Sequence, residues 1–297
     1  MYRTSPLCYD SQSRCRLFSA RRRAFVLLAT ICLTSATHSN LAFSALLAYD
    51  GFDYPNVGSD LLGNNGGFGF SNPWLIGGFN ASTNTNYDIA QDNLSFGNLQ
   101  TSGNRVQTGP TTAIAGLTRN LLQPMGTAGE TRYVSVLLRP EGTIGSGAFN
   151  GFFGINLEQP GEPEVFAGKP GGGALGQYVI ERRGGAFQSP TSANVELDTT
   201  TLLVLKAEFT SGLDTFSLFV NPTPGGLEPL TIDASTTGSV DTVTGLTIYS
   251  SGAFSLDELR YGETFADVVP VPEPNATFLL LLTAMIALRY PTRSAAA

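Results

Sequence analysis

The sequence predicts an all-β domain, because its central part consists of short apolar stretches separated by turn residues. Stretches such as 132–139 and 202–209 are rich in β-branched and other apolar residues and are bounded by Gly, Pro, Asn or Ser. The 297-residue chain contains 34 glycines, and no long amphipathic helix pattern separates the apolar stretches. Short strands at this spacing are typical of a β-sandwich or jelly roll, and residues 48–266, about 220 in number, fit one large domain.

The expected strands follow one another with turn residues between them. In chain order they are 132–139, 151–157, 177–181, 202–209, 215–220, 246–249 and 255–261. Thr210–Asp214 contains a glycine and predicts a hairpin turn between two strands. The strand after this turn should end at Asn221-Pro222, because proline cannot donate a hydrogen bond to a neighbouring strand. The acidic stretch 158–164 is rich in Pro and Gly and predicts a loop.

Charge and reactive side chains are distributed unevenly along the chain. All three cysteines and the single histidine, His38, lie within the first 40 residues. Residues 45–270 hold nine Lys or Arg and 22 Asp or Glu, a net charge of −13, which argues against a nucleic-acid partner. Once the N-terminal segment is removed, disulfides, histidine-ligated metals, cysteine nucleophiles and Ser-His-Asp triads are excluded. We therefore predict no catalytic residues and no metal ligands.

The N-terminal segment, residues 1–44, has the organisation of a secretory signal peptide. Arg21-Arg22-Arg23 precedes an apolar run of about ten residues, which is too short to span a membrane but suits a signal peptide. We expect cleavage after Ser44, with Ala36 as the alternative, and an uncleaved N-terminal membrane anchor as the competing interpretation.

The C-terminal segment, residues 267–297, combines a proline-rich motif with an apolar run. Pro272, Glu273 and Pro274 precede residues 276–288, which carry no charge and would form roughly 20 Å of helix. The apolar side chains of the expected membrane helix are Phe278, Leu279, Leu280, Leu281, Leu282, Met285, Ile286 and Leu288. Basic residues after the run favour a cytoplasmic C-terminal end.

This tail resembles the PEP-CTERM sorting signal of Gram-negative bacteria. The resemblance implies processing near Pro272-Glu273-Pro274 by an exosortase-type membrane protease, and exopolysaccharide in the producing cell. The basic tail departs from the usual pattern, since it holds only Arg289 and Arg293. The implied location is the cell envelope, outer surface or extracellular matrix, with transient anchoring in the inner membrane. A plain C-terminal anchor is the alternative.

The central domain resembles concanavalin A-like or LamG-like jelly rolls. The resemblance rests on Leu205-Lys206-Ala207-Glu208-Phe209, the strand at 215–220 and the closing Asp257-Glu258-Leu259-Arg260. The opening segments 49–55 and 64–74 also look like those of secreted, PEP-CTERM-tailed proteins from planctomycete-type bacteria, a family without an assigned activity. The implied fold is a concanavalin A-like jelly roll, and LamG-like domains often bind calcium.

Two groups of residues are candidates for binding or catalysis on a carbohydrate. Trp74, the only tryptophan, either stacks on a sugar or packs beside Phe68 and Phe70. An acidic group could supply the two carboxyls of a glycosidase, but its sequence favours a solvated loop. Its members are Glu158, Glu162, Glu164 and Glu181.

Two further segments have a functional and a structural interpretation. Oxygen-bearing side chains in 84–88 and 91–93 could ligate Ca²⁺, although turn chemistry explains the same residues. The segment Asp257–Arg260 is either a surface binding site or a closing strand. In the second case Leu256 and Leu259 pack inward and Glu258 pairs with Arg260 on the surface.

Three functions compete on this basis. The first is a non-enzymatic envelope or matrix protein that is sorted through its tail and associates with exopolysaccharide. The second is a lectin-like carbohydrate-binding module, which requires a defined site with exposed aromatic rings. The third is a polysaccharide hydrolase or lyase, for which Tyr178 and Tyr249 are the remaining candidate bases. We expect the first, with a polysaccharide partner, no nucleic acid and no cofactor apart from the Ca²⁺ alternative.

Overall fold

A computed structural model describes residues 46–78, 87–109, 114–142, 151–159, 162–174, 176–182 and 187–272. All of these residues belong to one compact unit of the chain, residues 44–297. The predicted signal peptide and the apolar C-terminal segment lie outside the described residues. Within the described part, no helix combines the length and the apolar character needed to cross a membrane.

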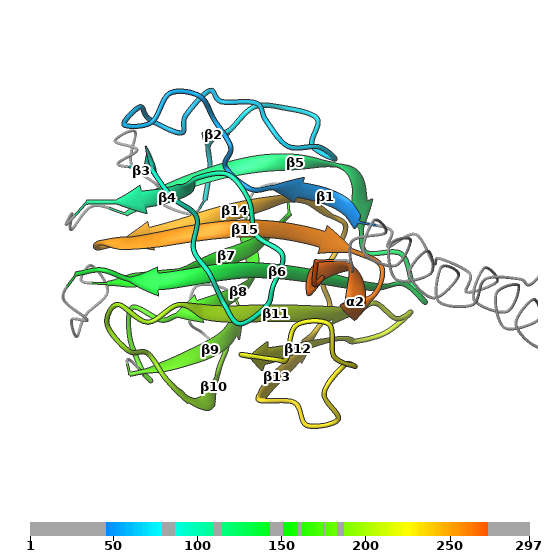
Figure 1. Ribbon diagram of the computed structural model, residues 1–297. Coiled ribbons are helices and arrows are strands. Elements are labelled where there is room, and N and C mark those ends of the chain that lie inside the picture. Colours follow the sequence, from blue (N-terminus) through cyan, green and yellow to red (C-terminus); the bar gives the residue numbers. More distant parts are fainter. Residues whose placement is uncertain are drawn as a thin grey trace, which may run out of the picture. The chain divides into compact units, whose positions relative to one another are not determined.

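The described residues form two antiparallel sheets, which confirms the predicted all-β sandwich (Figure 1). The eight-stranded sheet has the order β13(Ala234–Gly238), β12(Asp214–Val220), β11(Thr201–Glu208), β6(Thr131–Pro140), β15(Phe254–Gly262), β4(Arg105–Thr108) and β3(Tyr87–Ala90), and β1(Leu46–Asp50) also pairs with β15. The seven-stranded sheet has the order β10(Phe187–Asn194), β9(Gln177–Arg182), β8(Glu162–Lys169), β7(Phe152–Gln159), β14(Val243–Ser251), β5(Ala115–Met125) and β2(Leu75–Ile76). Neighbouring strands are often distant in sequence, as in a jelly roll, because the chain passes repeatedly between the two sheets.

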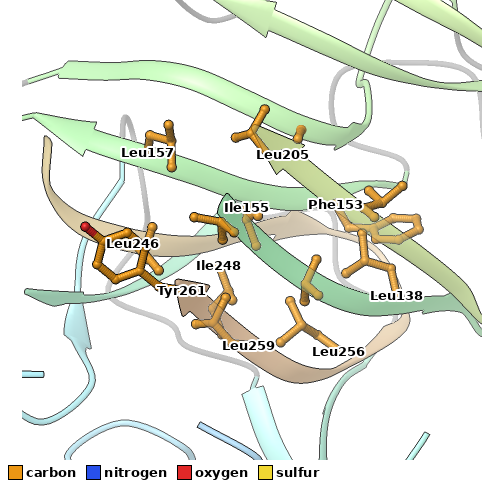
Figure 2. Packing of buried hydrophobic residues seen from close by; sticks show 14 of the residues in the cluster. Leu138, Phe153, Ile155, Leu157, Leu205, Leu246, Ile248, Leu256, Leu259 and Tyr261 are labelled. Carbon is orange, nitrogen blue, oxygen red and sulfur yellow. The ribbon is translucent and has the colours of Figure 1, made fainter. Parts of the chain in front are cut away.

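The main core lies between the inner faces of the two sheets (Figure 2). Leu138 and Leu256 of the eight-stranded sheet face Ile155 and Ile248 of the seven-stranded sheet, and each of the four is at least 94% buried. The rings of Phe153 and Phe254 stack across the sandwich with centroids 4.3 Å apart. Burying side chains of this size stabilises the fold by about 1.5–3 kcal/mol each.

A second apolar cluster covers the outer face of the eight-stranded sheet. Residues 91–104, here called the strap, cross this face between β3 and β4 (Figure 1). Leu94 and Leu99 of the strap pack with outward residues of β6 and β11 and with helix α2(Phe265–Val268). The outer face of this sheet is therefore largely closed by the protein's own chain.

Most expected strands and turns are confirmed, and one expected loop is wrong. β11 and β12 form the predicted hairpin around Thr210–Asp214, and β12 ends at Val220, before Asn221-Pro222. The stretch 158–164, predicted as a loop, instead belongs largely to the hairpin of β7 and β8. Pro163 lies opposite Glu158, where the register shifts, so the proline occupies an irregular position of the ladder.

Strand β15 contains a bulge that decides which residues face the core. Glu258 has a φ of 56°, and the pairing register with β6 shifts between Asp257 and Arg260. In a regular strand, residues three apart point to opposite faces. The additional residue at the bulge allows Leu256 and Leu259 both to point inward, as predicted, and leaves the carboxyls of Asp257 and Glu258 beneath the strap.

Candidate functional site

The outer face of the seven-stranded sheet carries the candidate site. Inward residues such as Ile155 and Ile248 belong to the core, so the alternate residues of the same strands point outward. A row of outward residues crosses the sheet from β10 to β5: Gln188, Glu181, Phe166, Asn156, Thr247 and Thr118. A second row, one step along the strands, holds Val179, Gly168, Gly154, Tyr249 and Gly116.

Glycines in the second row make space for aromatic rings to lie over the sheet. A Cβ atom on Gly154 would come within 2.7 Å of the Phe166 ring and 2.3 Å of the Ala167 carbonyl oxygen. On the other side, a Cβ atom on Gly116 would lie 3.1 Å from the Tyr249 ring. The glycines therefore have a packing role: each lets a neighbouring ring approach the backbone.

Tyr249 is a partly exposed aromatic residue of this face. Its centroid lies 5.0 Å from that of Phe152, with the rings tilted by 49°, and Phe152 itself is 93% buried. Burial raises the pKa of the Tyr249 hydroxyl to about 12, and the negative charge of Glu158 adds to the shift. The hydroxyl is consequently protonated at neutral pH and can donate or accept a hydrogen bond.

Polar groups surround this ring. Thr118 Oγ1 donates to Glu158 Oε2 at 3.4 Å, and burial raises the pKa of Glu158, although hydrogen bonds from Thr247 and Thr118 oppose that shift. Asn156, on the same face, is 99% buried, and its Oδ1 has no hydrogen-bond partner within the described structure. Because this oxygen is itself buried, it lies below the accessible surface of the face and offers no contact to a ligand at that surface.

The outward side chains of this face carry negative charge. Glu158 and Glu181 are outward, whereas Arg119 and Lys169 are each 99% buried on the inner side of their strands. Arg182 Nε donates to Thr236 Oγ1 of the opposite sheet. Among the described residues, no lysine or arginine therefore stands at an outward position of the seven-stranded sheet.

The acidic group proposed from the sequence does not assemble into one site. Glu158 is on β7 and Glu181 on β9, with β8 between them, a backbone separation of roughly 10 Å or more. Each has its own partner, since Gln188 Nε2 donates to Glu181 Oε2 at 2.9 Å. The side chains of Glu162 and Glu164 lie outside the described residues. Of the two candidate bases, Tyr178 is in the core, where its hydroxyl meets Thr201 Oγ1 at 3.0 Å.

Trp74 is buried in the core, so its ring has no surface for stacking on a sugar. Its ring is fully buried and stacks on Phe52, with centroids 5.9 Å apart. Trp74 Nε1 donates to Asp50 Oδ2 at 3.0 Å, and Asp50 also pairs with Arg119 at 2.9 Å. Trp74 is therefore a packing residue. Its indole N–H donates a hydrogen bond, as a buried tryptophan usually does.

The expectation of an exposed charge pair at 257–260 is wrong. Asp257 and Glu258 are fully buried, and Arg260 is 97% buried. Their side chains hold the strap: Asp257 accepts from Leu94 N at 2.8 Å, Glu258 accepts from Ser102 N at 2.6 Å, and Arg260 donates to the Gln100 carbonyl and to Glu258. The strap needs these acceptors because its buried N–H groups have no neighbouring strand.

These carboxyls are perturbed by their surroundings. Burial raises the pKa of Asp257 well above its usual value, and the charge of Glu258 adds to the shift. Burial also raises the pKa of Glu258, although the Arg260 guanidinium opposes that shift. The motif that suggested a binding surface therefore serves to fasten the strap onto the sheet.

The calcium alternative gains no ligand cluster in the described residues. Within the described residues, His, Cys, Asp and Glu side chains do not form any group of three or more that could hold a metal ion. The backbone carbonyl of Asp92 accepts from Arg105, and the Asn93 side chain donates to Leu94 O and Thr101 Oγ1. Residues 84–86 lie outside the described part.

A hollow of about 440 Å³ lies beside α2, on the other sheet. Its charged groups already neutralise one another, because Lys206 Nζ lies 3.1 Å from Glu228 and 3.2 Å from Glu208. The Tyr133 hydroxyl donates to Glu228 at 2.7 Å. The charged groups that line this hollow are therefore already partnered within the protein.

The residues of the predicted sorting tail are described only at their beginning. Pro272 is exposed at the end of the described chain. Glu273, Pro274 and the apolar residues from Phe278 to Leu288 lie outside it.

Comparison with known proteins gives distant likenesses only. No family model and no curated protein matches the chain. Among solved structures, the globular domain of T. cruzi calreticulin has 10% identity and a TM-score of 0.41, covering 73% of this chain and 90% of that one. Peanut lectin has 8% identity and a TM-score of 0.36, with coverage of 63% and 96%. An alginate lyase of polysaccharide lyase family 7 has 10% identity and a TM-score of 0.38, with coverage of 60% and 81%. With TM-scores below 0.5, these likenesses carry no inference about ligand or activity.

Proposed function

We propose that this protein is a non-catalytic carbohydrate-binding protein of the cell envelope that holds a polysaccharide against the outer face of its seven-stranded sheet. The observation that carries the proposal is the partly exposed Tyr249 ring, which packs on Phe152 and beside Gly116 of β5. An aromatic face of this kind packs against the apolar C–H surface of a sugar ring. Sugar hydroxyls can then donate to the adjacent carboxylate of Glu158.

The charge of the face defines the kind of polysaccharide. Glu158 and Glu181 are acidic, and no basic side chain balances them at outward positions of the described sheet. Like charges across an interface are unfavourable, whereas neutral hydroxyls pair well with carboxylates. The expected ligand is a neutral polysaccharide, and uronic acid polymers should bind more weakly.

The test is glycan-array binding of the folded protein, followed by titration of the best neutral oligosaccharide. Tyr249→Ala should weaken binding by about tenfold, which corresponds to roughly 1.4 kcal/mol. Tyr249→Phe should retain most of the affinity if ring stacking dominates. Phe68→Ala is the matched control, because Phe68 is also aromatic and 50% exposed but lies against β1 of the other sheet. Equal affinities for Tyr249→Ala and the wild type would remove this site from the proposal.

The same preparations test the non-catalytic part of the proposal. Polysaccharide incubated with the protein should release neither reducing ends nor unsaturated sugars. Burial raises the pKa of both Glu158 and Glu181 on this face, but strand β8 separates them, so they do not form a facing pair. Product formation that disappears in Glu158→Gln would reassign the face to a hydrolase or lyase.

The proposed location depends on the two ends of the chain. The signal-peptide pattern of residues 1–44 and the apolar run 276–288 support export followed by membrane anchoring. Pro272, the first residue of the Pro272-Glu273-Pro274 motif, is exposed, which is consistent with access by an exosortase-type protease. Mass spectrometry of the surface protein should find its C-terminus near this motif, and an intact tail would overturn the processing step.

A further inference from the structure

The loop between β12 and β13, residues 221–233, carries the most exposed apolar side chains of the described protein. Leu230 and Leu227 are 104% and 95% exposed, and Ile232 is 48% exposed. Fully exposed leucines are ordinary when single, but three within six residues form a local apolar surface. We call residues 221–233 the leucine loop.

The leucine loop is held in place, so its leucines are presented to the outside rather than left free to fold back. Its first part is anchored by the buried residues Pro222 and Pro224. In its middle, Glu228 accepts from the Tyr133 hydroxyl at 2.7 Å and pairs with Lys206 at 3.1 Å. At its end, Asp233 N donates to the Leu218 carbonyl at 3.1 Å.

The end of the described chain lies against this same loop. Gly225 N donates to the Val269 carbonyl at 2.8 Å, and a Cβ atom on Gly225 would lie 2.7 Å from Val271. The uncharged run begins at Ala276, four residues after Pro272. Four residues span at most about 14 Å, so the apolar run must start close to the leucine loop.

We propose that the leucine loop contacts the lipid surface next to the point where the C-terminal segment enters the membrane. This inference rests on the proposed membrane insertion of residues 276–288. Leu227 and Leu230 would enter the apolar edge of the bilayer, where leucine is favoured over water. The contact would fix how the β-sandwich stands on the membrane before its tail is processed.

The occupant is a lipid surface rather than a second copy of the chain because the tail brings the loop to the membrane. Insertion of residues 276–288 places the chain exit at the bilayer, and the loop is bonded to that exit through Val269. The acidic Glu228 between the leucines does not oppose this contact, because Lys206 pairs with it. Zwitterionic phosphatidylcholine is therefore a suitable test surface.

The experiment uses the full chain reconstituted in phosphatidylcholine vesicles, with and without brominated acyl chains. Leu230→Trp places a reporter on the leucine loop, and the buried native Trp74 supplies a constant background. Leu213→Trp is the matched control: Leu213 is 64% exposed and lies outside the leucine loop, in the turn between β11 and β12. Both substitutions replace exposed side chains and should leave the fold intact.

We expect bromine to quench the added emission of Leu230→Trp, with a shift to shorter wavelength, and to leave Leu213→Trp unchanged. If the protein floats with the vesicles in a density gradient but the emission of Leu230→Trp is not quenched, the loop contact is overturned and the tail insertion is retained. Protein that does not float with the vesicles would overturn the tail insertion and the loop contact together. A shift to shorter wavelength without quenching would assign the leucines to a contact between proteins and also overturn the inference.

Discussion

Removal of the Asp50 carboxylate should destabilise the domain more than removal of any exposed acid. Asp50 is 99% buried at the end of β1, and both of its oxygens accept hydrogen bonds. Oδ1 accepts from Phe52 N at 2.9 Å, and Oδ2 accepts from the Tyr54 hydroxyl, Trp74 Nε1 and Arg119 Nη1 at 2.6, 3.0 and 2.9 Å. All four partners are donors, and Asp50 is the only carboxylate among the described residues that pairs with Arg119.

The expected magnitude follows from the charge left behind. In Asp50→Ala, the Arg119 guanidinium, 98% buried, would lose its counter-ion while the Phe52 amide and the Tyr54 hydroxyl lose their acceptor. Breaking a buried ion pair by removing one partner costs about 3–5 kcal/mol. Asp50→Asn should cost less, because its Oδ1 can still accept, although its amide nitrogen would face a donor.

Urea unfolding followed by far-UV circular dichroism measures this difference. The matched control is Glu208→Ala. Glu208 pairs with Lys206, and the Glu208 side chain is 41% exposed. An exposed pair contributes about 0–1 kcal/mol, so the control should unfold close to the wild type. If Asp50→Ala also costs less than about 1 kcal/mol, the reasoning that this network anchors residues 51–74 is refuted.

Three further outcomes are expected. Gly154→Ala should lower the unfolding free energy by about 1–3 kcal/mol, since its Cβ atom would lie 2.3 Å from a backbone oxygen. Gly172→Ala is the control and should leave the unfolding free energy unchanged, because the position has open space around it. Equal unfolding free energies for the two variants would contradict the close approach at Gly154. Burial raises the pKa of Glu181, although its hydrogen bond from Gln188 opposes the shift. The folded state therefore holds this proton more tightly than the unfolded state, so ionisation lowers stability as pH rises above 4.5, and the unfolding free energy of Glu181→Gln should increase relative to that of the wild type between pH 4 and pH 8. A gain toward low pH would reverse the sign and reject the assignment. Added Ca²⁺ should leave the melting temperature unchanged, and a rise reversed by EDTA would restore the calcium alternative for 84–93.

The strand pattern was predictable because strand formation depends on local sequence. Alternation of apolar residues, with Pro and Gly at the ends, located β6, β11 and β12 and the hairpin at Thr210–Asp214. The stretch 158–164 misled the prediction, because its Pro163 suggested a loop while the register shift beside it accommodates the proline in a hairpin.

The site was less predictable, because it is made by residues from strands that are distant in sequence. Tyr249 and Glu158 are about 90 positions apart, and only the pairing of β14 with β7 brings them to one face. The outward glycines at 154 and 168 were a readable signal, since glycine within an apolar strand indicates close approach of another group. Nothing local distinguished Tyr249 from Tyr178, one on the outer face and one in the core.

The sequence by itself determined the all-β class, the acidic character of the domain and the confinement of Cys and His to the first 40 residues, because composition and strand periodicity are local properties. The tertiary structure alone decided the fate of the charged residues. Whether Asp257, Glu258 and Arg260 face solvent or lie buried depends on the bulge in β15 and on the strap that covers it. Likewise, Trp74 is buried against Phe52 and donates to Asp50, whereas Tyr249 lies on the outer face of the seven-stranded sheet. Burial is set by what packs against a residue, and that neighbour is usually remote in sequence.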